Sequence, residues 1–271
     1  MSAFEIPDVI YHYCTVDKLE KILHSKCMWL NPAWHMNDST ECQWYKFIVM
    51  NVVTKLSMDN TLDQNRLNKI CENVFLNGDF ATKFISSFSA DGDSLSQWRA
   101  YAGDGTGFAI GFETSKMQID TGLCLVNAND RYSIKLNKVI YDRNEQFDIM
   151  EAEIRKFLLN NSDPIESAVL SGLASIFKHP GFKDEQECRI IYTPPLFTAT
   201  LDHLSLELCH RDNGKNKIPF FKWPFPEPYP ITKIVFGPKN VMPHETIVSL
   251  LQGNGFSTEN IQITRSETPY R

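Results

Sequence analysis

Hydrophobic and polar positions along the chain follow two different periods. Residues 16–25 carry apolar side chains every three or four positions, which is the spacing of one helix face. Residues 84–89 alternate instead between two sets of positions, which is typical of a half-buried strand. We therefore expect a chain that mixes helices with short strands.

The same two criteria place the other elements. We expect one central sheet built from strands at residues 10–14, 84–89, 108–112, 138–141, 187–192 and 231–236. We expect helices around it at residues 16–25, 39–55 and 145–160, and further short elements near 28–30, 67–74, 94–101, 164–178, 218–222, 243–251 and 261–264. Strands spread through the chain, with helices between them, predict an α+β fold with a mixed or antiparallel central sheet. We interpret residues 1–271 as a single domain.

Two of the expected helices begin with capping signals. Thr15 directly precedes the first helix and is expected to cap it. Asp38 and Glu41 have the spacing of a capping box, with Asp in place of the usual Ser or Thr. Asn37 is not explained by capping, so a contact with a substrate or a metal stays open at this position.

Composition and charge narrow the class of protein. Hydrophobic residues make up 42% of the 271 residues and charged residues 22%, which is normal for a folded globular chain. Apolar runs fall short of the roughly 18 residues that span a bilayer, and the N-terminus lacks a secretory pattern. We therefore expect a cytoplasmic protein without a membrane partner. The formal net charge of −6 argues against binding of duplex nucleic acid.

Cysteine and histidine spacing gives no sign of a metal site. The 7 cysteines are scattered, odd in number and without a CxxC pair, so we interpret them as reduced thiols. The 7 histidines show no zinc-ligand spacing such as HExxH, and we predict no metal cofactor. The chain also lacks a Gly-x-Ser-x-Gly elbow and a P-loop. A Cys–His nucleophile pair stays open, but no motif favours it.

Several motifs occur in one order along nearly the whole chain. They are Tyr11-His12-Tyr13-Cys14-Thr15, Asn37-Asp38 with Glu41, Ser87-Phe88-Ser89, Trp98, Tyr101-Ala102, Gly107, Ile110-Gly111-Phe112, Glu185-Gln186-Glu187-Cys188-Arg189 and the terminal Ser266-Glu267-Thr268-Pro269-Tyr270-Arg271. In this order they resemble the domain-of-unknown-function family 2971, although Ser39 stands where that family usually has proline. This resemblance implies no activity.

A second resemblance carries a chemical hypothesis. His12 on the first strand, Ser86 to Ser89 on a middle strand and Glu185-Gln186-Glu187 on a later one are similar in order to ADP-ribosyltransferase folds. Two departures stand out. Phe88 interrupts the serine strand, and His12 replaces the arginine usual beside a Glu-x-Glu pair. The resemblance implies an ADP-ribosyltransferase-like fold with NAD as substrate.

The resemblance assigns catalytic roles to the two glutamates. Breaking the glycosidic bond of NAD develops positive charge on the ribose, which a carboxylate at Glu187 could stabilise. Glu185, two residues earlier on the same face, could accept a proton from the incoming nucleophile. Acids at the start of a strand are also common solvated residues, so a structural role stays open. Arg189 could pair with a carboxylate, which we favour, or with a diphosphate.

Other residues are candidates for holding NAD. His12 could donate to a ribose hydroxyl, or it is a half-buried structural histidine. Ser87 and Ser89 could hold the nicotinamide amide or brace the glutamate, although we favour them as polar positions of an edge strand. Tyr13 and Tyr101 could stack on the nicotinamide ring, or they are core aromatics.

A phosphate contact is a weaker hypothesis. Arg99 lies on a short helix and could bind a phosphate through two hydrogen bonds. Gly103, Gly105 and Gly107 follow it and could let backbone amides approach the same group. No strand precedes this glycine run, so its similarity to a phosphate-binding loop is weak.

Two functions follow from these observations. The first, which the sequence favours, is an NAD-dependent ADP-ribosyltransferase or NAD glycohydrolase that acts on an unknown protein or nucleotide acceptor. The second is a non-enzymatic module that senses a small ligand or binds a partner. The enzyme requires His12, Ser87 and Glu187 to meet in one cleft, whereas the module allows them to be buried apart.

Overall fold

A computed structural model defines most of the chain. It describes residues 5–35, 41–76, 83–124, 133–159, 163–194, 206–212, 214 and 216–270. The expected capping residue Asp38 and its neighbour Asn37 lie outside these ranges.

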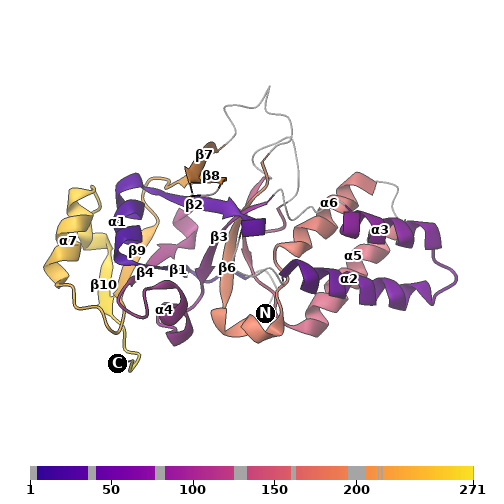
Figure 1. Ribbon diagram of the computed structural model, residues 1–271, viewed down its shortest axis with the longest axis horizontal. Helices are drawn as coiled ribbons and strands as arrows, with labels where there is room; N and C mark the ends of the chain where they lie inside the picture. The colour runs from indigo at the N-terminus through magenta and orange to yellow at the C-terminus, as the bar shows by residue number, and fades with distance from the viewer. Residues whose placement is uncertain are drawn as a thin grey trace.

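The described strands form a 10-stranded mixed sheet (Figure 1). They are β1 Val9–Cys14, β2 Cys27–Pro32, β3 Phe84–Ser89, β4 Phe108–Glu113, β5 Ile134–Lys138, β6 Glu187–Tyr192, β7 Glu207–Asp212, β8 Lys217–Pro224, β9 Ile231–Phe236 and β10 Gln262–Arg265. The order is β10-β9-β4-β1-β3-β2-β8-β7, and β6 and β5 branch from β3. Only the pairing of β10 with β9 is parallel among the named strands.

Strand β3 is the point at which the sheet divides. β6 pairs with β3 along its whole length, from Phe84 to Ser89. On the other edge of β3, β1 pairs only at Ser89, whereas β2 pairs only at Phe84 and Ile85. The backbone of Ser87 therefore lies where β1 and β2 separate from each other.

The helices lie on different parts of the sheet (Figure 1). They are α1 Val16–Ser25, α2 Glu41–Ser57, α3 Gln64–Leu76, α4 Leu95–Tyr101, α5 Arg143–Leu159, α6 Asp163–Ala174 and α7 His244–Gly253. Helices α2, α3, α5 and α6 gather together, and their apolar side chains form one core with Ile85 and Ile191 of the sheet. Helices α1 and α7 contribute to a second core, which contains Phe84 and Phe88.

Alternation along the strands divides the side chains between these cores. Phe84 and Phe88 face the core of α1 and α7, whereas Ile85 faces the core of α2, α3, α5 and α6. Glu187 pairs with Ser89, and Arg189 pairs with Ser87. Both charged residues therefore face the same side as Ile85, toward the core formed with α2, α3, α5 and α6, which we call the helical core.

Most predicted elements are confirmed, and one strand prediction is wrong. Residues 138–141 were expected as a strand, but β5 ends at Lys138. Lys138 pairs with Cys188, and the next amide donates to the carbonyl of Glu187, where β6 begins, so no further partner strand exists. Ile140 makes only an isolated bridge with Phe177. The exposed strand β7 was not predicted because its residues are mostly polar.

The predicted side-chain cap of α1 is also wrong. Thr15 occupies the position before the helix, but its hydroxyl donates to the carboxylate of Asp17 instead of capping a backbone amide. The helix ends at Ser25, and the next residue, Lys26, adopts the left-handed conformation (φ 49°) and donates a hydrogen bond from its backbone amide to the carbonyl of Ile22. Among the predicted helices, α6 ends earlier than expected, at Ala174.

One carboxylate, that of Asp93, anchors the C-terminal segment. Its Oδ2 accepts hydrogen bonds from the amides of Glu267 at 2.7 Å and Thr268 at 3.2 Å. Its Oδ1 accepts from the Trp98 indole at 2.7 Å and from the Ser266 hydroxyl. Asp93 therefore joins the last residues of the chain to α4 through hydrogen bonds to a charged acceptor.

We expect Asp93→Ala to lower the free energy of unfolding by about 2 kcal/mol or more, because it leaves several donors without their charged acceptor. Chemical denaturation measures this loss. Asp212→Ala is the control, since Asp212 is exposed and, within the described residues, its carboxylate accepts a hydrogen bond only from the backbone amide of Gly214. A loss no larger than that of the control would contradict the anchoring role.

Candidate functional site

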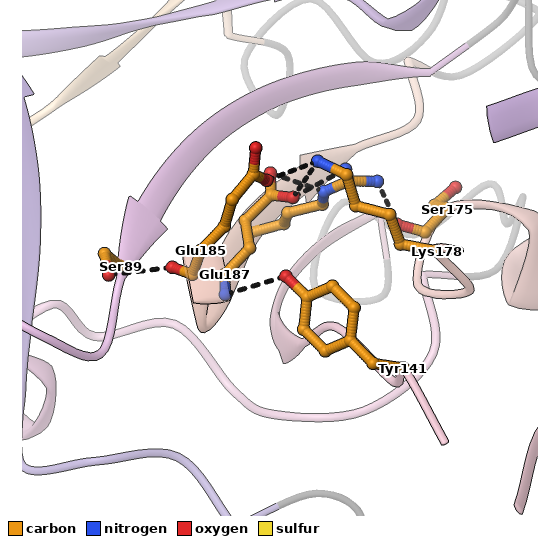
Figure 2. Close-up of polar contacts among 7 residues, drawn as sticks. Ser89, Tyr141, Ser175, Lys178, Glu185 and Glu187 are labelled. Carbon is orange, nitrogen blue, oxygen red and sulfur yellow. Dashed lines mark hydrogen bonds and ion pairs between the residues drawn. The ribbon is translucent and has the colours of Figure 1, made fainter. Parts of the chain in front are cut away.

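Four charged side chains meet at the beginning of β6 (Figure 2). We call Lys178, Glu185, Glu187 and Arg189 the charged cluster. Glu187 and Arg189 lie on β6, Glu185 ends the short helix η5 Pro180–Glu185, and Lys178 follows α6. Gln186 between the two glutamates adopts φ 45, which turns the chain from η5 into β6.

The strongest contact of the cluster joins two residues of the same strand. Arg189 Nε lies 2.8 Å from Glu187 Oε1, and Arg189 Nη2 lies 2.8 Å from Glu187 Oε2. Arg189 Nη1 also donates to the carbonyl of Ser175 at 2.9 Å. Residues two apart on a strand share a face, so the guanidinium can grip both carboxylate oxygens. The pairing of Arg189 with a carboxylate, which the sequence favoured, is therefore present.

Lys178 links the two glutamates. Its Nζ lies 3.0 Å from Glu187 Oε2 and 2.6 Å from Glu185 Oε2. The side chain of Glu187 is 6% exposed and that of Glu185 20%, so Glu185 is the solvent-facing member. The backbone amide of Glu187 donates to the hydroxyl of Tyr141 at 3.0 Å (Figure 2). Burial raises the pKa of Tyr141, so this hydroxyl keeps its proton.

The surroundings of Glu187 keep its carboxylate ionised. Burial raises the pKa of this carboxyl, but the charge and hydrogen bonds of Arg189 outweigh burial, with a further contribution from Lys178. The resulting pKa is about 2. Glu187 is therefore a buried anion whose two oxygens are both bonded to cations of the same chain.

His12 lies on the other face of the sheet. Its ring meets Phe88 edge-on, with 5.8 Å between ring centroids, and Phe88 belongs to the core of α1 and α7. His12 Nδ1 lies 3.0 Å from the carbonyl oxygen of Ser87. Burial lowers the pKa of His12, which favours the neutral ring. The β3 backbone therefore separates His12 from Glu187, and the two side chains do not share a cleft.

The two candidate serines differ in their contacts. Ser89 Oγ donates to the carbonyl of Glu185 at 2.8 Å and accepts from the amide of Asp91 at 3.2 Å. The Ser87 hydroxyl is buried without a hydrogen-bond partner, yet it faces Glu187 closely enough to lower the pKa of that carboxyl. Ser89 thus braces the turn before β6, whereas Ser87 faces the charged cluster.

The candidate tyrosines belong to β1 and α4, which are not the elements that carry the charged cluster. Tyr13 is buried and packs edge-on against Trp98, with 4.7 Å between ring centroids. Its hydroxyl donates to the carbonyl of Asp91 at 2.8 Å and accepts from the amide of Ser94 at 2.9 Å. Tyr101 ends α4 and is 39% exposed. Tyr13 therefore organises the loop before α4.

Two of the three glycine amides proposed for the phosphate contact after α4 already have partners within the chain. Arg99 is exposed on α4. The amide of Gly105 donates to the carbonyl of Trp98 at 3.1 Å, and that of Gly107 donates to the carbonyl of Ala102 at 2.8 Å. Gly107 is required for packing, since a Cβ there would lie 2.1 Å from the carbonyl oxygen of Cys14. The amides of Gly105 and Gly107 therefore stabilise the turn and are not available to a phosphate.

The remaining candidates lie near α2. Asn37 and Asp38 fall outside the described residues, and Glu41 is the first residue of α2. The predicted contacts of these residues therefore stay predictions.

Sequence reasoning missed several residues that the structure places around β6. They are Lys178, Tyr141, Ser175 and Asn137. Lys178 carried a signal, because it directly follows the apolar run Ile176-Phe177 and a lysine rarely has its 5% exposure without a charged partner. The others had none, since each comes from a segment distant in sequence.

The fold and the charged cluster define an α+β protein with a buried ion network at the start of a central strand. Residues 97–190 of the chain match the family model described as Protein of unknown function (DUF2971). The resemblance inferred from the sequence motifs is confirmed over this stretch, which contains the whole charged cluster. Comparison with curated proteins gives no match, and comparison with solved structures gives none.

Two properties of the described residues bear on ligands and membranes. Within the described ranges, no group of three or more His, Cys, Asp or Glu side chains is placed to hold a metal ion. In the same part of the chain, no helix has both the length and the apolar character needed to cross a bilayer.

We expect Glu187→Gln to destabilise the fold by about 3–5 kcal/mol, because it leaves a buried arginine and lysine without their shared anion. Urea denaturation measures the change. Glu185→Gln is the matched control, since its side chain is 20% exposed and contacts the same lysine. We expect a clearly smaller loss for the control, and equal losses would argue against the special position of Glu187.

The low pKa of Glu187 also predicts a pH dependence. Its pKa falls from the ordinary 4.5 to about 2 on folding, which corresponds to about 3 kcal/mol of stability at neutral pH. Because the folded pKa is the lower one, this stability is complete above about pH 4.5 and is lost progressively as the pH falls toward 2. The stability difference between the wild type and Glu187→Gln should therefore shrink over this window. A difference independent of pH between 2 and 5 would contradict the assignment.

Proposed function

We propose that this protein is a non-enzymatic module that senses a small ligand or binds a partner. One observation carries the proposal, namely that both carboxylate oxygens of Glu187 are bonded within the chain, to Arg189 and Lys178. A carboxylate that stabilises a ribosyl cation must present an oxygen to that cation. Freeing one here means breaking a buried ion pair, which costs about 3–5 kcal/mol.

The position of His12 supports the same proposal. In the enzyme hypothesis, His12 and Glu187 both act at the ribose of NAD and border one cleft. His12 instead packs on Phe88, on the face of the sheet opposite to Glu187. Its Nδ1 forms a hydrogen bond with the carbonyl oxygen of Ser87. Ser87 lies beside Glu187 but His12 does not, so the three side chains do not meet on one face of the sheet, which is an arrangement that the module allows.

A second candidate function is an NAD-dependent ADP-ribosyltransferase or NAD glycohydrolase with an ADP-ribosyltransferase-like fold. The observation that favours it is the Ser87 hydroxyl, which is buried without a partner beside the ionised Glu187. In this function Ser87 would help to hold NAD, and the acceptor would be a protein or a nucleotide. Glu185, the more exposed carboxylate, would accept the proton of the nucleophile.

An NAD consumption assay separates the two functions. We expect no NAD consumption by the wild type above that of Ser87→Ala, a variant that leaves the ion pairs of Glu187 in place. A wild-type turnover that falls on the order of 100-fold in Ser87→Ala would overturn the module and support the enzyme.

ADP-ribose provides an independent binding test. A nucleotide cleft bordered by His12 and Glu187 would let ADP-ribose at 100 times its Kd stabilise the fold by about 2.7 kcal/mol. We expect no such stabilisation in a thermal-shift titration at millimolar concentration. A saturable shift that Ser87→Ala abolishes would favour the second candidate.

A further inference from the structure

Three side chains near Arg189 carry buried polar atoms without a hydrogen-bond partner. These atoms are the hydroxyl oxygens of Ser87 and Ser175 and both amide atoms, Oδ1 and Nδ2, of Asn137. Asn137 is 1% exposed and Ser175 is 0% exposed. These atoms are shielded from bulk water, so water at the surface cannot be their partner. The neighbouring charged groups, in contrast, are paired within the chain.

The three side chains surround the same arginine. Ser87 on β3 and Asn137 on β5 both pair directly with Arg189 on β6, so the three form one row across adjacent strands. Residues paired in this way point to the same face of the sheet, which here is the helical side. Ser175 lies at the far end of the arginine side chain, where its carbonyl accepts from Nη1 at 2.9 Å. Figure 2 shows Ser175 beside the charged cluster.

Buried polar atoms without partners are costly. Leaving one buried donor or acceptor unsatisfied costs about 1–3 kcal/mol, and native proteins satisfy nearly all such groups. A concentration of four such atoms around one arginine therefore indicates that another molecule completes their hydrogen bonds.

We propose that this row is a binding site for a small neutral molecule that carries a carboxamide. Asn137 offers both a donor and an acceptor, and its natural complement is a second amide, which forms two hydrogen bonds with it. A primary carboxamide then keeps one N–H, which can donate to a serine hydroxyl, and one oxygen lone pair, which can accept from a serine hydroxyl. Ser87 and Ser175 provide such hydroxyls on either side of Arg189.

The charges around the row favour a neutral ligand. Glu187 is bonded to Arg189 and Lys178, and the unpartnered atoms are all neutral hydroxyl and amide groups. A charged ligand would lose its hydration without meeting a free opposite charge among these groups, which is unfavourable. This inference rests on the proposed function, because it names the class of small ligand that the module would sense.

The test compares two buried asparagines with acetamide as the probe. Asn137→Leu removes an amide without partners. Asn240→Leu removes an equally buried amide that bonds the carbonyl of Gly107 and the amide of Met242. Without acetamide, we expect Asn240→Leu to lower Tm and Asn137→Leu to leave Tm unchanged or raised, because only the former loses hydrogen bonds.

With acetamide, we expect a saturable rise in Tm for the wild type and for Asn240→Leu but not for Asn137→Leu. Ligand efficiency limits so small a molecule to a Kd on the order of 1 mM, and saturation should then raise Tm by roughly 5 °C. The site is refuted by an acetamide response that survives Asn137→Leu, or by no response in the wild type. A Tm loss in Asn137→Leu equal to that of Asn240→Leu would show that water already satisfies Asn137, which also overturns it. These results leave the NAD and ADP-ribose tests untouched, so the two proposals can fail separately.

Discussion

The pairing of Glu187 with Arg189 is the interaction on which this part of the structure depends. Both residues lie on β6, between β3 and β5, and both face the helical core. Arg189 also donates a hydrogen bond to the carbonyl of Ser175 just beyond α6, and Lys178 also donates one to the carboxylate of Glu185. These ion pairs and hydrogen bonds therefore connect the region after α6 and the end of η5 to strand β6. Their cost in desolvation is offset by contacts that satisfy both carboxylate oxygens.

This constraint also determines the chemistry that the site can perform. A carboxylate with a pKa of about 2 is ionised, which suits the stabilisation of positive charge, but its partners already supply that charge. The polar groups that stay unpartnered are instead the neutral ones of Ser87, Asn137 and Ser175. On our proposal, the site therefore serves hydrogen-bonded recognition and not electrostatic catalysis. The cluster lies wholly within residues 97–190, the stretch that matches the family model.

Sequence patterns predicted the strands better than the site. β3 and β6 were predictable because each is a short run that contains β-branched and aromatic residues, and period two alone places Glu187 and Arg189 on one face. The face of His12 was not predictable, because it depends on the register of β1 against β3 and β4, which no local pattern encodes. Lys178 and Ser175 reach the cluster through tertiary packing. The strand expected at 138–141 failed for a similar reason, since its end is set by where β6 begins.

The ionisation of Glu187 shows directly whether Arg189 and Lys178 hold its carboxylate as a buried anion. Carboxyl carbon NMR of the intact protein, labelled at glutamate and assigned with Glu187→Gln, follows this single group through a pH titration. The account predicts a pKa of about 2, with the resonance unchanged from neutral pH down to about pH 3. A pKa at or above the ordinary 4.5 would contradict it, because the carboxylate would then not be held by Arg189 and Lys178.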